Sequence, residues 1–123
     1  MNVVDSSGWL EYFAGTARSE LFAPAIEDTD QLVVPSLTLF EVYKRVHLQR
    51  SETAALNAVA TMQQARVVDL DAQLALAAAR LSASTRLPLA DSIILATARA
   101  TESMLWTQDA DFEGMEGVRY LAR

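Results

Sequence analysis

Short apolar runs alternate along the chain with longer segments in which apolar residues recur at helical spacing. The short runs are rich in valine and leucine and end at a turn residue, an acid or a proline, as buried strands do. Their composition predicts strands at residues 2–5, 32–34, 66–70, 104–107 and 118–121. The chain is therefore expected to contain about five short strands.

The segments between these strands carry helix signals. Two short helices, 9–13 and 18–27, are expected around Gly15, after a turn at residues 6–8. Ser36 and Asp71 are suitable N-caps for two of the longer helices, and Pro88 can open another. The segment 89–101 is apolar on nearly every side, which is typical of a buried helix. The longer predicted helices span residues 36–50, 53–64, 71–82 and 89–101.

Strands that are separated by helices need crossover connections, and such connections produce parallel sheets with helices on both faces. The predicted fold class is α/β, with three α/β/α layers around a central parallel sheet of about five strands. A chain of 123 residues is the size of one domain, so a single domain spanning 1–123 is expected. Ligands in such folds bind beyond the carboxyl ends of the strands.

Composition narrows the possible chemistry. The chain is 51% hydrophobic and 21% charged, which suits a globular core, and its lack of cysteine excludes disulfides, thiolate metal sites and cysteine nucleophiles. No apolar stretch approaches the roughly 18 residues that a membrane span needs, and residues 1–5 lack the features of a signal peptide. A cytoplasmic protein without membrane contact is expected.

The net negative charge of the chain affects whether it can bind nucleic acid. The net charge is −6 and the pI is about 4.6, whereas phosphate binding depends on lysine and arginine. Acids that gather around bound cations would nevertheless form a phosphate site. The placement of the acids therefore matters more than their number.

Four acidic positions are candidates for one site, and each also has a simpler explanation. Asp5 ends the first predicted strand and could instead begin a turn or cap a helix. Glu41 lies one turn inside a helix and could pair with Arg45 at i+4. Asp91 lies in the first turn of the apolar helix, where the helix dipole favours an acid. Asp109 follows the fourth strand and could be a turn residue.

The presence of all four acids together is harder to explain by these separate roles. In a doubly wound sheet they can share one edge, where four carboxylates repel unless cations join them. Hard divalent ions such as Mg²⁺ prefer oxygen ligands, and two such ions balance four carboxylates. Two divalent metal ions held in this way support phosphodiester hydrolysis without a histidine, cysteine or serine nucleophile. The single histidine, His47, is accordingly expected at the surface.

Other phosphate chemistries lack their required residues. Phosphatases that form an aspartyl-phosphate usually carry a second Asp two positions after the first, and this chain has Ser7 there. The only lysine, Lys44, lies in the middle of a helix rather than at a strand end. No glycine-rich loop for nucleotides is present.

The four acids lie within four longer segments of characteristic sequence: VVDSS at 3–7, PSLTLFEV at 35–42, LPLADSII at 87–94 and LWTQDADF at 105–112. These segments resemble the four motifs of PIN domains. Their order and spacing and the length of the chain are similar to those of the VapC toxins of bacterial and archaeal toxin–antitoxin pairs.

The resemblance implies an Mg²⁺- or Mn²⁺-dependent endoribonuclease that hydrolyses RNA, is held in check by a VapB-type antitoxin and forms a homodimer. It assigns Asp5, Glu41, Asp91 and Asp109 to the family's acidic quartet, as metal ligands and catalytic residues. Thr107, Asp111 and Ser6 are further candidates for supporting the site.

Aromatic residues gather in the early helices and have two possible roles. Trp9, Tyr12, Phe13 and Phe22 could pack in the core. Alternatively, the first three could line an apolar groove for an antitoxin helix. The basic residues Lys44, Arg45 and Arg50 could contact RNA phosphates or form a solvated helix face.

Two other functions remain open at this stage. A PIN-like module could be catalytically inactive and only bind a partner protein. A metal-dependent phosphatase or a nuclease acting on DNA would also use the same carboxylates.

Overall fold

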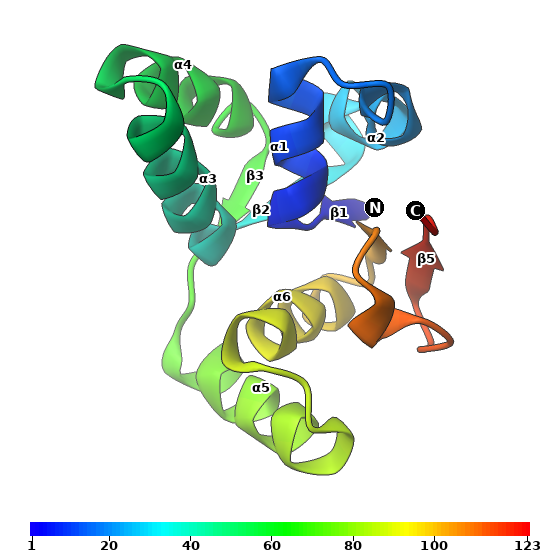
Figure 1. The fold of residues 1–123 in the computed structure, drawn as a ribbon. Coiled ribbons are helices and arrows are strands. Elements are labelled where there is room, and N and C mark those ends of the chain that lie inside the picture. Colours follow the sequence, from blue (N-terminus) through cyan, green and yellow to red (C-terminus); the bar gives the residue numbers. More distant parts are fainter.

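A five-stranded parallel sheet forms the centre of the chain in the computed structural model, which describes residues 1–123 (Figure 1). The strand order is β3-β2-β1-β4-β5, and each neighbouring pair is parallel. The strands are β1 (Asn2–Val4), β2 (Leu32–Pro35), β3 (Arg66–Val68), β4 (Met104–Thr107) and β5 (Val118–Tyr120). All five predicted strands are confirmed, with ends that differ by up to two residues.

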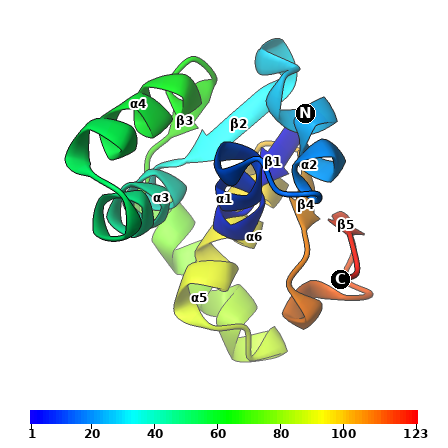
Figure 2. The same cartoon turned by 45° about the horizontal axis from the view of Figure 1, so that its top comes forward.

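Six α-helices cover the two faces of this sheet. Four of them, α1 to α4, pack on one face, whereas α5 and α6 pack on the other (Figures 1 and 2). The helices are α1 (Ser6–Ala14), α2 (Ser19–Ile26), α3 (Ser36–Gln49), α4 (Glu52–Met62), α5 (Ala72–Thr85) and α6 (Leu89–Ala100), with 3-10 turns η1 (Thr29–Gln31) and η2 (Ala110–Phe112). The predicted three-layer α/β/α architecture is confirmed. None of the helices combines the length and apolar character needed to cross a membrane.

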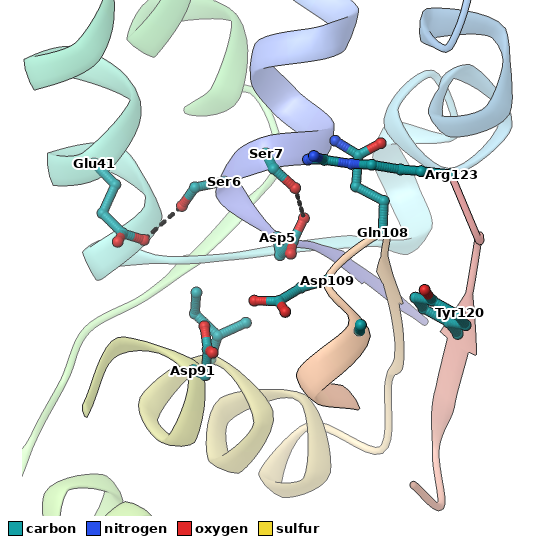
Figure 3. A pocket seen from close by; sticks show the side chains of 11 residues that line it. Asp5, Ser6, Ser7, Glu41, Asp91, Gln108, Asp109, Tyr120 and Arg123 are labelled. Atoms are coloured by element: carbon teal, nitrogen blue, oxygen red, sulfur yellow. Dashed lines mark hydrogen bonds between the residues drawn. The ribbon is translucent and has the colours of Figure 1, made fainter. Parts of the chain in front are cut away.

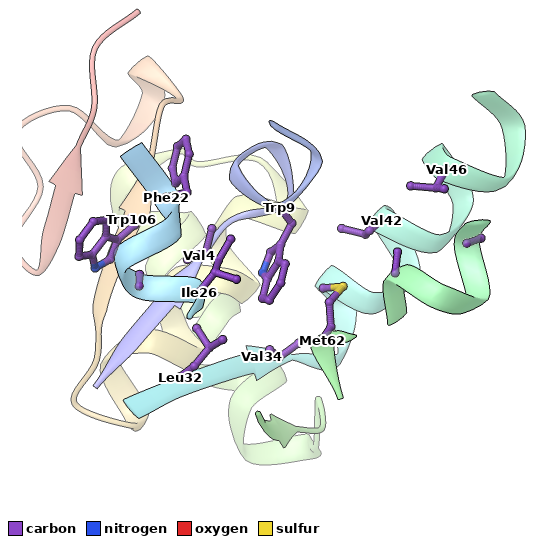
Figure 4. Packing of buried hydrophobic residues seen from close by; sticks show 13 residues of the cluster. Val4, Trp9, Phe22, Ile26, Leu32, Val34, Val42, Val46, Met62 and Trp106 are labelled. Carbon is purple, nitrogen blue, oxygen red and sulfur yellow. The ribbon is translucent and has the colours of Figure 1, made fainter. Parts of the chain in front are cut away.

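Alternating side chains of the strands divide the core in two. Val4 and Val34 point to the face covered by α1 to α4, where they join Trp9 and Phe22 in the larger hydrophobic cluster (Figure 4). The intervening Val3, like Val33 and Leu105, points to the opposite face and packs against α6. This alternation follows from the two-residue period of a strand, and here both faces are apolar because both are covered.

The helix α6 is the most deeply buried helix of the fold. Seven consecutive residues, Ser92–Ala98, are buried, because the helix is enclosed between the sheet and α5. The prediction of a buried helix from its apolar circumference is confirmed. Burial of this helix carries Asp91, one position before the buried run, to the rim of the sheet.

The start of α1 and the N-cap of α3 differ from the prediction. The first helix begins at Ser6 rather than Trp9, because the side chain of Asp5 accepts a hydrogen bond from the backbone N–H of Gly8 and caps it. The predicted turn at residues 6–8 is therefore wrong. Ser36 was expected as an N-cap, but the N-cap of α3 is Pro35, and the Ser36 hydroxyl instead accepts from the Leu70 N–H. Asp71 caps α5 as predicted.

The strand order creates a crevice at the carboxyl edge of the sheet. The chain adds β2 and β3 on one side of β1, and then passes to the other side of β1 to add β4 and β5. The direction in which strands are added reverses between β1 and β4. Helices that follow the strands on either side of this reversal diverge, which opens the edge of the sheet there. The fold thus places a ligand crevice directly after Asp5.

Gly8 allows α1 to approach the sheet closely, and this gives a stability prediction. A Cβ at Gly8 would lie 2.7 Å from Val4 Cγ1 and 2.7 Å from Phe22 Cδ1, both on fully buried side chains. We expect Gly8→Ala to destabilise the fold by about 1–3 kcal/mol through overpacking. This cost exceeds the gain in helix propensity of about 1 kcal/mol. Thermal melting measures the change.

A compensating substitution provides the control for this steric argument. Phe22→Leu in the Gly8→Ala background should recover part of the lost stability, because it removes one of the two overlaps. A melting temperature that is unchanged or raised in Gly8→Ala alone would show that the helix tolerates a Cβ here.

Candidate metal centre

A pocket of about 490 Å³ lies at the carboxyl edge of the sheet and collects the predicted acids (Figure 3). Asp5 follows β1, Glu41 projects from α3, Asp91 from the first turn of α6, and Asp109 follows β4. Four segments that are far apart in the sequence therefore supply one carboxylate each. The full lining is Asp5, Ser6, Ser7, Glu41, Asp91, Ile94, Gln108, Asp109, Ala110, Tyr120 and Arg123.

Asp5 is buried at the base of this pocket and is held by three hydrogen bonds. Its Oδ1 accepts from the Gly8 N–H at 3.1 Å and from the Ser7 hydroxyl at 3.0 Å. Its Oδ2 accepts from the Thr107 hydroxyl at 2.5 Å. Burial raises the pKa of Asp5 above its ordinary value, even though these hydrogen bonds favour the ionised form. The helix-cap role considered from the sequence and a place in the site thus coincide in one residue.

Thr107 links two of the acids. Its hydroxyl donates to Asp5 and accepts from the backbone N–H of Asp109 at 3.0 Å, and the residue is fully buried at the end of β4. Asp109 Oδ1 in turn accepts from the Asp111 N–H at 2.9 Å and caps η2. The threonine hydroxyl therefore joins one oxygen of the Asp5 carboxylate to the backbone of Asp109.

Glu41 is half-buried and is oriented by Ser6. The Ser6 hydroxyl donates to Glu41 Oε1 at 2.5 Å across the gap between α1 and α3. No ion pair joins Glu41 to Arg45, so the surface salt bridge considered from the sequence is not formed. The hydrogen bond turns the Glu41 carboxylate toward the pocket, as Figure 3 shows.

Asp91 is half-buried among the other acids of the pocket. Burial, together with the negative charges of Asp109, Asp111, Asp5 and Glu41 in that order, raises the pKa of Asp91 to about 7. Near neutral pH this carboxyl group is therefore partly protonated. A half-buried acid that is surrounded by other acids and makes no ion pair is a candidate for binding a cation.

A subset of the acids lies within reach of one ion. Carboxylate oxygens of Asp91, Asp109 and Asp111 all lie within 4.8 Å of one another. Asp111 does not line the pocket, but its exposed carboxylate reaches this group from η2. Asp5 and Glu41 lie in the same pocket outside this closest group. The all-oxygen donor set suits Mg²⁺ or Mn²⁺ rather than a metal that prefers nitrogen or sulfur.

Several residues of the pocket were not singled out from the sequence. Ser7 donates to Asp5, whereas Gln108, Tyr120 and Arg123 form the wall opposite Glu41 (Figure 3). Gln108 lies inside the fourth motif, so its position beside Asp109 was available as a signal. Tyr120 and Arg123 carried no signal, because only the pairing of β5 with β4 brings them to the pocket.

Other candidate residues lie away from the pocket. His47 is exposed and stacks on Tyr43 with a centroid distance of 5.8 Å, which confirms its place at the surface. Trp9 is 1% exposed and belongs to the core, so it offers little surface to a partner in the free chain. Tyr12 and Phe13 are only half-buried. The basic side chains of Lys44, Arg45 and Arg50 are exposed on and just after α3.

A comparison with protein-family models matches residues 3–118 to the PIN domain. The chain belongs to the PIN domain family. The matched region contains all four acids and extends from β1 to the start of β5. No curated protein sequence matches the chain significantly.

Solved structures of toxin–antitoxin proteins share the fold of this chain. A toxin–antitoxin complex from Klebsiella pneumoniae is similar with a TM-score of 0.81 and 25% identity, over 97% of this chain and 96% of that chain. The DNA-bound VapBC of Salmonella typhimurium matches with a TM-score of 0.75 and 17% identity, over 99% and 98% of the chains. A sarcin–ricin loop cleaving VapC toxin of Mycobacterium tuberculosis matches with a TM-score of 0.72 and 18% identity, over 92% of each chain. These similarities confirm the resemblance to VapC-type PIN domains.

Proposed function

We propose that this chain is a metal-dependent endoribonuclease and the toxin component of a type II toxin–antitoxin pair, with residues 1–123 forming a single PIN domain. The observation that carries the proposal is the convergence of Asp5, Glu41, Asp91 and Asp109 on one pocket at the carboxyl edge of the sheet. Membership of the PIN family and the likeness to VapC-type toxins support the same function.

Mg²⁺ or Mn²⁺ is the proposed cofactor. The fit rests on the grouping of carboxylate oxygens and on half-buried Asp91, whose pKa is raised to about 7 by burial and by the neighbouring acids. Asp91, Asp109 and Asp111 would hold an ion from within 4.8 Å of one another, with Asp5 and Glu41 completing the acidic wall. When bound, divalent ions neutralise the carboxylates and stabilise the negative charge that develops on a phosphate during hydrolysis.

The residues of the chain itself act by orientation. The Thr107 hydroxyl holds the Asp5 carboxylate and the backbone of Asp109, whereas the Ser6 hydroxyl holds the Glu41 carboxylate. The carboxylates are therefore preorganised for binding. The Ser6 and Ser7 hydroxyls donate to carboxylates and are therefore assigned to orientation. No histidine or lysine lines the pocket, so we propose that water is the nucleophile.

A VapB-type antitoxin is the proposed protein partner. Tyr12 and Phe13 lie half-buried on α1, and Phe13 stacks on the buried Trp9 at 5.6 Å. Phe13 also borders a hollow of about 220 Å³ between α1, α3 and α4, which suits an apolar side chain of a helical segment. Trp9 would then support this contact from beneath. We also propose a homodimer, for which exposed Leu76 on α5 and Leu89 on α6 offer apolar surface.

A cleavage assay tests this function directly. The purified chain should cleave single-stranded or structured RNA in the presence of Mg²⁺ or Mn²⁺, and EDTA should stop the reaction because it removes the ions that neutralise the acids. Gel electrophoresis of an end-labelled RNA measures cleavage. A DNA oligonucleotide of the same sequence is the matched control substrate.

Two results would contradict the proposal. Preferential cleavage of the DNA oligonucleotide would indicate a nuclease of another specificity. Absence of cleavage for every RNA tested with both metals, by a chain that melts cooperatively, would indicate an inactive PIN-like module that binds a partner.

A further inference from the structure

The acidic pocket contains one basic side chain. Arg123 lines it opposite Glu41, and Figure 3 shows this side chain extending across Gln108 toward the start of α1. None of the remaining lysine and arginine residues lines the pocket. A polyanion that enters the pocket therefore meets a single arginine beside the carboxylates.

The guanidinium group of Arg123 has no partner within the chain. It makes no hydrogen bond, and the only salt bridge of the structure joins Arg18 to Glu11. Arg123 is exposed and thus not committed to neutralising the acids around it. An unpaired arginine at the mouth of a site is available for a ligand, and its planar fork suits a phosphate group.

Tyr120 lies on the same wall, at the end of β5. Its ring is partly exposed, it lines the pocket, and its hydroxyl makes no hydrogen bond within the chain. An aromatic ring at the edge of a nucleic-acid site can stack on an unpaired base of any identity. Arg123 and Tyr120 thus offer the two contacts that a single nucleotide needs.

Arg18 holds the segment that carries Arg123. Its Nη2 donates to the carbonyl oxygen of Leu121 at 2.7 Å, and its Nη1 donates to that of Ala122 at 3.3 Å. Its Nε donates to Gln108 Oε1 at 2.6 Å, so one guanidinium joins the loop before α2, the end of β4 and the segment after β5.

Gln108 completes this network. It is buried, and its Nε2 donates to Glu11 Oε2 at 3.2 Å, which is the same carboxylate oxygen that pairs with Arg18. Gln108 directly precedes Asp109, so the network also connects the segment after β5 with the acidic site.

We propose that Arg123 and Tyr120 form an RNA-binding subsite beside the carboxylates, and that Arg18 is the residue that positions it. Arg123 pairs with a backbone phosphate next to the bond that is cut, and Tyr120 stacks on an adjacent base. Arg18 contacts no RNA and acts by fixing Leu121 and Ala122. This inference rests on the proposed ribonuclease function and adds residues that bind substrate to it.

Binding of RNA can be measured apart from cleavage. In an Asp91→Asn background, a fluorescein-labelled 20-nucleotide single-stranded RNA of mixed sequence is titrated with protein in Mn²⁺, and fluorescence anisotropy reports Kd. Arg123→Ala should raise Kd by about tenfold, because it removes one charge-assisted contact. It should also lower the slope of log Kd against log salt concentration by about 0.7, the value for one phosphate of a single strand.

Arg66→Ala is the matched control. Arg66 is exposed at the beginning of β3, on the opposite edge of the parallel sheet. Its substitution should leave both Kd and the salt slope unchanged. Equal effects of Arg123→Ala and Arg66→Ala, or no effect of Arg123→Ala, would overturn the assignment of Arg123.

Tyr120 is tested by a pair of variants. Tyr120→Leu should raise Kd by about tenfold, whereas Tyr120→Phe, which keeps the ring, should bind as the unmodified background does. Loss of binding in Tyr120→Phe equal to that in Tyr120→Leu would contradict stacking.

A double-mutant cycle tests the positioning role of Arg18. Arg18→Gln and Arg18→Lys each lose the fork that binds two carbonyls, so each should raise Kd as Arg123→Ala does. Combining Arg18→Gln with Arg123→Ala should add little further loss, because both changes remove the same contact. Full additivity of the two losses would show that Arg18 acts elsewhere.

The two proposals fail in different ways. If the wild-type chain does not cleave RNA while Arg123→Ala still weakens RNA binding, the subsite stands and the ribonuclease function fails. If the wild-type chain cleaves RNA and Arg123→Ala leaves KM, kcat and Kd unchanged, the subsite fails and the function stands.

Discussion

Asp91→Asn should lower the rate of RNA cleavage by about 100-fold or more while the fold stays intact. The substitution keeps the shape of the side chain and removes one of the three carboxylates that lie within reach of a single ion. Loss of a group that only orients a metal ligand typically costs about 10–100-fold in affinity or activity, so loss of a ligand itself should reach at least the upper end. Initial cleavage rates with Mn²⁺ measure the effect, and circular dichroism checks the fold.

The other acids should follow in an order set by their surroundings. Asp5→Asn and Glu41→Gln should also remove most activity, because both carboxylates line the pocket and are oriented by hydroxyl groups. Asp111 belongs to the same close group of carboxylates, but Asp111→Asn should have the mildest effect of the acids. Its carboxylate is exposed and lies outside the pocket lining, so water can replace it at the ion.

Asp28→Asn is the matched control for these variants. Asp28 is exposed, lies before η1 and makes no capping hydrogen bond, so this variant should cleave at the wild-type rate. Wild-type cleavage by Asp91→Asn would remove Asp91 from the metal centre.

The metal-free protein should melt at a higher temperature at pH 5.5 than at pH 8. The pKa of Asp91 is about 7 in the folded chain, whereas that of a free aspartate is about 3.9. Between these values the folded state holds a proton that the unfolded state releases. Stability from this group is therefore fully present below pH 4 and is lost as the pH rises through 7. The raised pKa of Asp5 acts in the same direction.

Divalent ions should reverse this loss at pH 8. They bind the folded site and hardly bind the unfolded chain, so at ten times Kd they stabilise by about 1.4 kcal/mol. That gain should raise the melting temperature by about 3–6 °C in a domain of this size. At pH 5.5 the gain should be smaller, because protons compete with the ions for Asp91.

Melting curves in EDTA and in Mn²⁺ at both pH values measure these effects. Asp91→Asn should raise the metal-free melting temperature at pH 8, flatten its dependence on pH and shrink the gain from metal. Asp28→Asn should behave as wild type in all four conditions. Equal gains from metal in wild type and Asp91→Asn would contradict the assignment of Asp91 as a ligand.

Both sets of experiments depend on the same physical feature. Asp91 is carried to the pocket by α6, whose burial removes water from around the carboxyl group, and the neighbouring acids then raise its pKa further. The same surroundings that make the ionised form costly without metal make a divalent ion favourable.

The pattern of the chain determined the layers of the fold and the members of the acidic quartet. Valine-rich runs separated by helical segments allow only strands joined by crossovers, and burial of α6 follows from its apolar circumference. The quartet was predictable because Asp5 and Asp109 each follow a strand. Glu41 and Asp91 lie in the first two turns of helices at the same edge. These properties depend on local composition and on the order of strands and helices, and both can be read directly from the sequence.

Helix starts were less predictable, because caps are decided by competition among neighbouring polar side chains. Asp5 begins α1 three residues earlier than the apolar periodicity indicated, and Ser36 bonds to Leu70 rather than to its own helix. In each case the partner of a short polar side chain depends on which backbone groups the fold brings near.

Only the tertiary structure decided which residues orient and surround the carboxylates. Ser6 meets Glu41 across 35 positions, Thr107 meets Asp5 across 102, and Arg18 meets Leu121 across 103. The raised pKa of Asp91 likewise results from burial together with acids on other elements. Such contacts depend on how packed helices and strands are placed in space to within an ångström, and no local pattern of residue types contains that placement.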